Sequence, residues 1–139
     1  MKKSVSFENS KNVHPPLGLH SHSVLVPEGT ELIFVSGQVG VKPDGSLPDS
    51  LYDQADQAFQ NILEILEDRG LSYKSIIKLN TYIVSDDPNG DVKAARIKNL
   101  GDHRPASTAV WVKRLVNPDW MVELEAIAAN VNISTQPEN

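Results

Sequence analysis

Apolar residues recur every three or four positions across residues 50–69, a spacing that predicts a long amphipathic helix. Ser50 is suited to capping its first turn, and Gly70 follows directly after the pattern. A weaker helical pattern covers residues 91–100 and stops near Gly101. The sequence therefore predicts two helices, each with an apolar side that must pack against another element.

Most of the other segments have the composition of β-strands. Runs that are β-branched or that alternate between apolar and polar positions predict strands over residues 4–7, 21–26, 31–41, 76–84, 108–115 and 121–130. Turn residues at 27–30 predict a hairpin between the second and third of these runs. Asn117-Pro118-Asp119 predicts another, antiparallel hairpin between the last two. This order of elements indicates an α+β fold, in which a mixed sheet carries helices on one face.

The chain shows neither internal repeats nor low-complexity segments, so residues 1–130 are expected to form a single domain. Residues 131–139 are polar and are expected to be a flexible tail. Within the predicted sheet, residues 32–35, 109–112 and 122–127 carry apolar side chains on both strand faces. Two helices can cover only one face, so we expect another copy of the chain to cover the other.

Composition narrows the classes of partner. Among 139 residues there are 13 Lys plus Arg and 18 Asp plus Glu, a formal net charge of −5. An acidic surface does not favour phosphate groups, so neither nucleic acid nor a membrane is expected as a partner. No apolar run approaches the roughly 20 residues that span a bilayer, and the first ten residues lack a signal core, so we expect a cytoplasmic protein. The absence of cysteine excludes disulfides, a thiol nucleophile and Cys-based metal sites.

Ser36-Gly37-Gln38 follows the most apolar predicted strand. A glycine there allows backbone to approach a ligand closely and offers N–H donors to an oxyanion or carboxylate. The alternative is a glycine bulge that bends the strand.

Glu123 and Glu125 lie two residues apart in the last predicted strand and therefore point to the same face. One of them could act as a general base that activates water. The alternative, which applies most to Glu125, is an ion pair across a subunit interface with Lys113 or Arg114.

His20 and His22 could place two imidazoles on one side of an extended segment. No third ligand is fixed by the sequence, so a polar pocket wall or an ordinary surface position is favoured over a metal site. The motifs of serine hydrolases and phosphate-binding loops do not occur. We therefore expect neither a metal nor a cofactor.

Five short motifs follow one another along the chain: His20-Ser21-His22, Ser36-Gly37-Gln38, Ala58-Phe59-Gln60-Asn61-Ile62, Pro105-Ala106-Ser107-Thr108 and Val122-Glu123-Leu124-Glu125-Ala126-Ile127-Ala128. In this order they resemble the reactive-intermediate deaminase family, RidA, also called YjgF. The resemblance implies a chorismate-mutase-like α+β fold, a homotrimer, and pockets for a small-molecule ligand at the subunit interfaces. It also implies hydrolysis of enamines and imines released by pyridoxal-phosphate enzymes, which yields a 2-oxo acid and ammonia.

The resemblance implies roles for particular residues. Glu123 takes the position of the family's water-handling glutamate, and the backbone of Gly37, beside Ser36, lines the pocket. His20 stands where active members have a tyrosine, which changes the hydrogen-bonding group without removing it.

Ser107 is the main departure from the family pattern. Deaminating members read Pro-Ala-Arg-Ser, and their arginine holds the substrate carboxylate, whereas Ser107 occupies that position here. A serine hydroxyl cannot reproduce the two charge-assisted hydrogen bonds of a guanidinium. Arg104 is a candidate replacement, although it lies three residues earlier and faces differently.

Thr108 is expected to be a further polar contact. Trp111 shares the strand face of Ser107 and forms either an apolar pocket wall or interface core. Two functions stay open: hydrolysis of an imine, an enamine or a related metabolite with water positioned by Glu123, or binding of a small metabolite by the trimer without turnover.

Overall fold

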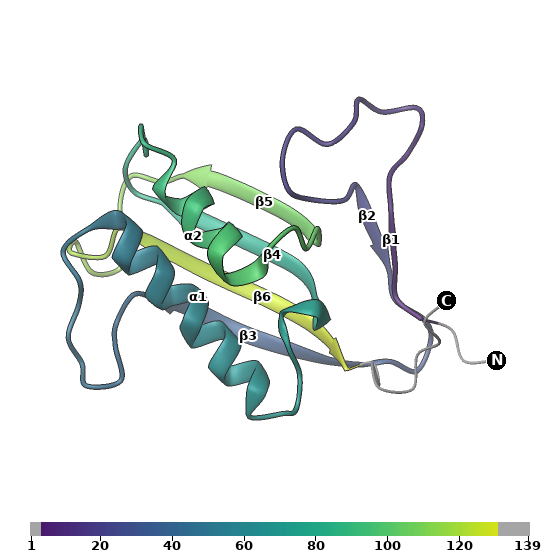
Figure 1. Cartoon of the computed structure of the whole chain (residues 1–139), viewed down its shortest axis with the longest axis horizontal. Helices are drawn as coiled ribbons and strands as arrows, with labels where there is room; N and C mark the ends of the chain where they lie inside the picture. Colours follow the sequence, from purple (N-terminus) through teal and green to yellow (C-terminus); the bar gives the residue numbers. More distant parts are fainter. Residues whose placement is uncertain (1–3, 131–139) are drawn as a thin grey trace.

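The computed structural model describes residues 4–130, which form a four-stranded sheet with two helices on one face and a small two-stranded sheet beside it (Figure 1). The strands are β1 (Ser6–Glu8), β2 (Ser23–Leu25), β3 (Glu31–Val39), β4 (Ile76–Ile83), β5 (Ala106–Trp111) and β6 (Val122–Asn130). The helices are α1 (Leu51–Glu67), α2 (Asp91–Leu100) and the short 3-10 helix η1 (Tyr73–Ser75). Residues 131–139, predicted as a flexible tail, lie outside the described part of the chain.

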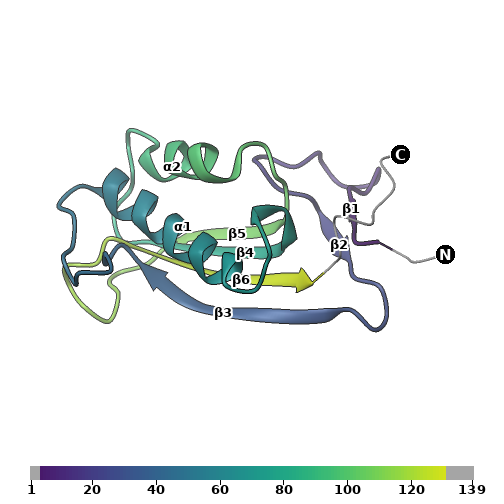
Figure 2. The ribbon, with the colours of Figure 1, turned by 60° about the horizontal axis from the view of Figure 1, so that its bottom comes forward.

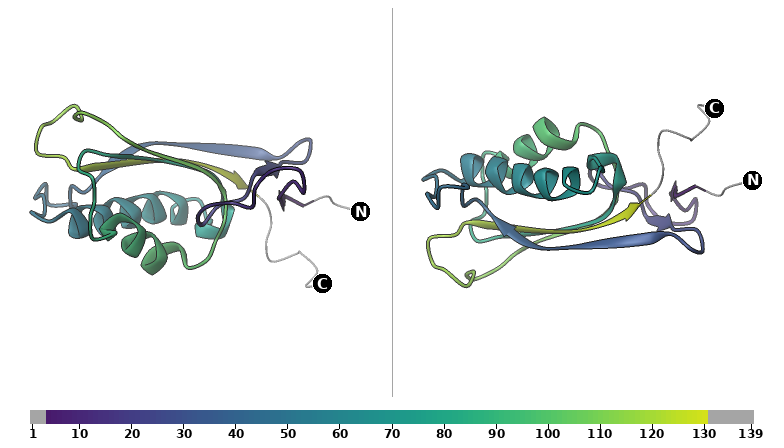
Figure 3. Two further views of the ribbon diagram at one scale, coloured as in Figure 1. Left: turned by 90° about the horizontal axis from the view of Figure 1, so that it is seen from above. Right: turned by 90° about the horizontal axis from the view of Figure 1, so that it is seen from below.

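The strand order of the larger sheet is β3-β6-β4-β5. β4 and β5 run parallel, and the other neighbours are antiparallel, so the sheet is mixed. Both helices lie on the same face of it, as Figures 2 and 3 show. The predicted α+β arrangement and both predicted helices are thus confirmed, and Ser50 caps α1 by accepting the N–H of Asp53 at 3.1 Å.

The predicted hairpin between residues 21–26 and 31–41 is wrong. β2 pairs with β1, and β3 pairs with β6 instead. Ser21 explains the difference, because it is buried and donates both its N–H and its hydroxyl to carbonyls at the start of β5, those of Pro105 (3.2 Å) and Arg104 (2.6 Å). These bonds hold residue 21 at the sheet edge opposite β3, out of reach of a hairpin with it.

The second predicted hairpin, between the last two strands, is also wrong, because β4 lies between β5 and β6. The crossover from β4 through α2 returns the chain parallel to β4 and places β5 at an edge. β6 contains nine residues and bonds on both sides, to β3 and to β4. The turn residues near Pro118 therefore belong to a longer connection and not to a hairpin.

Alternation of buried and partly exposed side chains over residues 77–83 of β4 and 122–128 of β6 builds the core. Leu79 pairs with Ala126 and Ile83 with Val122, and these side chains are buried beneath α1. The facing side of α1 contributes Ala55, Ala58, Phe59, Ile62 and Leu66, all at most 1% exposed. Between residues 4 and 130, neither helix is long and apolar enough to cross a membrane.

The other face of the sheet carries the alternate residues of the same strands, including Asn80, Tyr82, Glu123 and Glu125. Phe34 of β3 also belongs to this open face and is 72% exposed. In the described part of the chain, both helices pack on the opposite side of the sheet (Figure 3). The open face is therefore available to a ligand or to another chain.

Gln54 joins the start of α1 to the connection that enters β6. It is 2% exposed, and its amide donates to the carbonyls of Pro48 (2.9 Å) and Asp119 (3.2 Å) while accepting the N–H of Met121 (2.9 Å). One buried side chain thus provides hydrogen-bond partners for three backbone groups.

Replacing Gln54 should cost stability because its backbone partners would be left unpaired. We expect Gln54→Leu to lower the free energy of unfolding by about 1–3 kcal/mol, measured by urea denaturation at fixed protein concentration. Gln60→Leu, at an exposed position of the same helix, is the matched control and should change it by less than about 0.5 kcal/mol. Equal stability of the two variants would contradict the role assigned to Gln54.

Candidate functional site

Glu123 lies directly against the backbone of Gly37. The ladder between β3 and β6 is irregular between Val35 and Gln38, so Gly37 lies outside regular pairing. A Cβ atom added to Gly37 would be 1.9 Å from Oε2 of Glu123 and 2.8 Å from its Cδ. Gly37 thus occupies an irregularity of the strand, as the alternative interpretation expected, and its missing side chain leaves space for the carboxylate of Glu123. Approach of a ligand to this backbone stays a prediction.

The two glutamates of β6 are used differently. Oε1 of Glu125 accepts the hydroxyl of Tyr82 at 2.6 Å and the amide of Asn80 at 3.1 Å. These two hydrogen bonds lower the pKa of Glu125 from its ordinary value. Within residues 4–130, the carboxylate of Glu123 has no hydrogen-bond partner, so of the two it is the one available to a ligand or to water.

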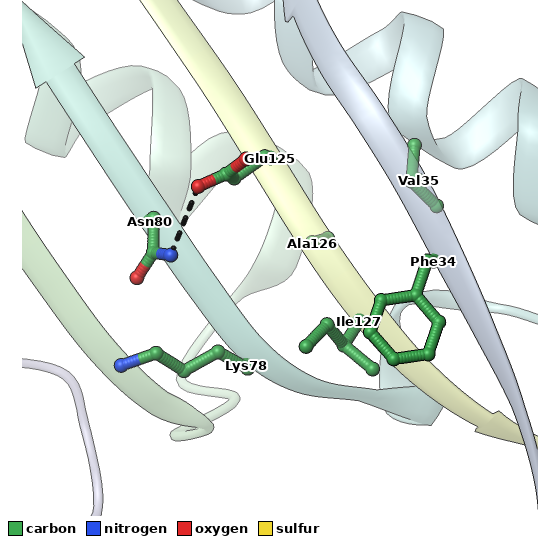
Figure 4. A pocket seen from close by; sticks show the side chains of 7 residues that line it. All are labelled: Phe34, Val35, Lys78, Asn80, Glu125, Ala126 and Ile127. Carbon is green, nitrogen blue, oxygen red and sulfur yellow. Dashed lines mark hydrogen bonds between the residues drawn. The ribbon is translucent and has the colours of Figure 1, made fainter.

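A shallow cavity of about 160 Å³ opens on the same face (Figure 4). Its polar lining is Lys78, Asn80 and Glu125, and Phe34 and Ile127 are the larger apolar residues. Lys78 and Asn80 were not among the residues selected from the sequence. The signal was available, because both alternate with buried apolar residues along β4 and must lie on the face opposite the core.

Ser107 faces the other way, toward α2. It pairs in register with the buried Leu79, and its hydroxyl donates to the carbonyl of Pro105 at 3.2 Å. Nη2 of Arg96, on α2, donates to the same hydroxyl at 3.3 Å and also to the carbonyl of Leu19. The guanidinium of Arg96 therefore lies within hydrogen-bond distance of the Ser107 side chain.

Arg104 reaches the same loop as Arg96. Its Nη1 donates to the carbonyl of Gly18 at 3.3 Å, next to the carbonyl used by Arg96. The imidazole of His20 packs over Gly18, with Nδ1 3.5 Å from a Cβ built there. His20, Ser107 and the two arginines thus gather around residues 18–20.

Arg96 was not among the residues selected from the sequence. Val92, Ala95 and Leu100 mark the buried side of α2, and Arg96 follows Val92 by four residues. A charged residue in the apolar stripe of a helix is the signal that could have found it.

The remaining candidates are dispersed. Thr108 lies on the open face, and its hydroxyl accepts a hydrogen bond from Nζ of Lys78 at 3.3 Å. Ser36 is exposed, and Trp111, at the end of β5, is 68% exposed. The ring of His22 bonds the backbone of Ser10 and His14 in the N-terminal loop. In residues 4–130, no three acidic or histidine side chains are close enough together to hold a metal ion.

The main predicted site residues fall into two groups, Glu123 and Gly37 on β6 and β3, and His20 and Ser107 beside β5. Gly37 belongs to β3 and Ser107 to β5, with β6 and β4 between them. At a strand spacing of about 4.8 Å, these two strands are roughly 14 Å apart. One chain therefore does not bring Glu123 and Gly37 together with His20 and Ser107.

Comparison with known proteins assigns the chain to a family. A sequence family described as Endoribonuclease L-PSP matches residues 13–130. The chain belongs to this RidA/YjgF/L-PSP family. Protein HMF1 of Saccharomyces cerevisiae is 35% identical over 112 residues, covering 79% of this chain and 83% of that protein. A 2-iminobutanoate/2-iminopropanoate deaminase of Rattus norvegicus is 29% identical over 121 residues, covering 86% and 85%.

The crystal structure of Escherichia coli TdcF with bound serine superposes with a TM-score of 0.68 at 28% identity and covers 94% of this chain and 100% of that chain. Membership of the RidA family confirms the resemblance drawn from the five motifs, and this superposition confirms the α+β fold. The trimer, the interface pocket and the roles of single residues stay predictions.

The contact between Gly37 and Glu123 separates two kinds of glycine substitution in this RidA-family chain. In Gly37→Ala, the new methyl group meets the end of a flexible side chain, which can move. In Gly40→Ala, it would lie 2.6 Å from backbone atoms of Gln54 in α1, which cannot. We expect Gly40→Ala to lower the free energy of unfolding by about 1–3 kcal/mol and Gly37→Ala by less than about 0.5 kcal/mol, with a displaced Glu123 in its crystal structure. Equal destabilisation would show that Glu123 is held rigidly.

Proposed function

We propose that this chain forms a homotrimer with a small-metabolite pocket at each subunit interface, where Glu123 positions water for hydrolysis of an imine, an enamine or a related metabolite. The observation that carries the proposal is the carboxylate of Glu123, which lies on the open face of the sheet against the backbone of Gly37. Its neighbour Glu125 is already occupied by Tyr82 and Asn80, which leaves Glu123 as the acid group for chemistry.

The division of candidate residues between two separate parts of the sheet supports an assembly. Glu123 and Gly37 lie near β3, whereas His20 and Ser107 lie at β5. In a closed ring, the open face near β3 of one copy can meet the β5 side of the next copy, which brings the two groups of residues together. The exposed Phe34 and Val110 on the open face are the kind of side chain that such contacts bury.

The proposed reaction adds water across a C=N bond. The carboxylate of Glu123 accepts a proton as the water oxygen bonds to the imine carbon, and the nitrogen is protonated. The C–N bond then breaks, the oxygen becomes a carbonyl, and ammonia leaves with the hydrogens of one water molecule. The backbone N–H groups around Gly37 can donate to the developing oxygen. Similarity to a 2-iminobutanoate/2-iminopropanoate deaminase supports this class of substrate.

A small molecule fits the chain better than RNA, although the family description names an endoribonuclease. A protein that binds a polynucleotide neutralises several phosphates with Lys and Arg, whereas this chain has a formal net charge of −5. Similarity to a protein whose crystal structure holds serine points the same way.

The second candidate function is metabolite binding without turnover. The observation that favours it is Ser107, since the family pattern has at this position the arginine that holds the substrate carboxylate. The same pocket could then retain a ligand yet fail to orient an imino acid for attack.

The oligomeric state tests the proposed location of the pocket. Light scattering at micromolar concentration should report about three times the chain mass of 15.3 kDa. A stable monomer would leave Glu123 and Ser107 two strands apart on opposite faces of the sheet and would contradict an interface pocket.

Glu123→Gln tests the chemistry. The amide cannot take a proton from water, so the release of ammonia from imines generated with an amino-acid oxidase should fall by roughly 10²- to 10⁴-fold. Thermal unfolding and trimer mass should stay unchanged, because no described residue depends on Glu123 for a hydrogen bond. Glu64→Gln, at an exposed position of α1, is the control and should keep full activity.

Two outcomes would count against this assignment. Dissociation of the Glu123→Gln trimer would show that Glu123 belongs to an interface ion pair. If the wild-type protein binds 2-oxobutanoate but releases no ammonia above the spontaneous rate, the binding function replaces the hydrolase.

A further inference from the structure

Arg96 is a charged residue on the inner side of α2, and its hydrogen-bond acceptors among residues 4–130 are both neutral. Its Nη2 donates to the carbonyl of Leu19 and to the hydroxyl of Ser107. Its Nε is buried and has no acceptor among residues 4–130. A guanidinium has five N–H donors, and the described contacts of Arg96 use only one of its three nitrogens.

A second cation adds to the positive charge at this place. Arg104 donates to the carbonyl of Gly18, the residue before Leu19. Within the described residues, neither guanidinium has a carboxylate partner, and the ion pair found there joins Lys98 to Asp56. Burial, and to a smaller degree the nearby Arg104, lowers the pKa of Arg96 from its ordinary value.

Two close cations with spare donors attract an anion. Removing a charge from water is costly unless an opposite charge or strong hydrogen bonds compensate. Neutral acceptors orient Arg96 without cancelling its charge, so an anion that reaches both guanidiniums would gain charge-assisted hydrogen bonds. The loop of residues 18–20, in which His20 packs on Gly18, lies beside the two guanidiniums.

We propose that Arg96, assisted by Arg104, binds the carboxylate of the small ligand and so supplies from α2 the guanidinium that Ser107 does not provide from β5. This inference rests on the proposed function, because it assumes that the ligand of the interface pocket carries a carboxylate. The register supports the exchange of positions, since Ser107 faces α2 and its small side chain leaves room for Arg96. An arginine at both positions would crowd two guanidiniums into one space.

Calorimetric titration of the full-length protein with 2-oxobutanoate tests the inference without requiring turnover. Arg96→Ala should weaken binding roughly 10- to 150-fold, the equivalent of one lost charge-assisted hydrogen bond. Arg96→Lys keeps the positive charge but loses the planar guanidinium with its paired donors. Its affinity for 2-oxobutanoate should therefore lie between those of the wild type and Arg96→Ala. Lys93→Ala, at an exposed position of the same helix, is the matched control and should bind as the wild type does.

A relocated arginine provides the sharper test. Arg96→Ala combined with Ser107→Arg returns a guanidinium to the same space from β5, and it should recover most of the lost affinity. Failure to recover affinity in a folded, trimeric double variant would overturn the shared position of the two side chains.

Arg96 also ties α2 to the carbonyl of Leu19, so Arg96→Ala could fail to fold. Arg96→Lys then carries the test, with thermal unfolding recorded alongside the titration. Wild-type affinity in folded Arg96→Lys and Arg96→Ala would overturn the inference, as would tighter binding of inorganic phosphate than of 2-oxobutanoate. Binding of butanone, which lacks the carboxylate, should be weak and equal in all variants.

The proposed function fails separately. If the wild-type protein releases no ammonia but binds 2-oxobutanoate, and Arg96→Ala abolishes that binding, the carboxylate site is supported and the hydrolase function is contradicted. If the wild type and Arg96→Ala hydrolyse imines equally well, the hydrolase function is supported and the role of Arg96 in binding the carboxylate is contradicted.

Discussion

The two helices cover only one face of the four-stranded sheet, and the location of the site follows from that constraint. Residues 77–83 of β4 and 122–128 of β6 alternate between the two faces, so the residues that pack beneath α1 force their neighbours onto the open face. A carboxylate on the covered face would have to be paired or neutralised at a cost of several kcal/mol. On the open face, Glu123 and Glu125 stay accessible until a ligand or another chain meets them. The alternation that builds the core therefore also determines where the acid groups can be used.

Neighbouring strands then give the two glutamates different environments. Asn80 and Tyr82 on β4 occupy Glu125 and favour its charged form. Glu123 instead faces the irregular part of β3, where Gly37 has no side chain and no regular pairing. A residue with a Cβ at position 37 would fill the space that the carboxylate of Glu123 occupies. The backbone irregularity and a carboxylate with no hydrogen-bond partner among residues 4–130 are thus one local feature, and the proposed water-handling role is based on it.

Local patterns in the sequence predicted the elements, and they failed where pairing depends on distant residues. The helical spacing, the cap at Ser50 and the shared face of Glu123 and Glu125 are properties of neighbouring residues, and all are present. Both predicted hairpins are absent, because Ser21 is tied to the start of β5 and because α2 carries the chain across to a parallel strand. Gly37 and Glu123 could be selected by motif and parity. Arg96 carried a signal of its own, a charge within the apolar stripe of a helix, but its relation to Ser107 exists only once α2 lies against β5.

A cation supplied by a helix differs physically from one supplied by the strand. On β5, an arginine at position 107 would reach the space beside α2 from an edge strand. Arg96 is instead tied by the carbonyl of Leu19 and the hydroxyl of Ser107, so part of its conformational entropy is already lost before a ligand arrives. Because both acceptors are neutral, this restraint leaves the positive charge uncompensated. Orientation without neutralisation is the property that a carboxylate-binding guanidinium requires, and it explains how a serine at position 107 can be compatible with an anionic ligand.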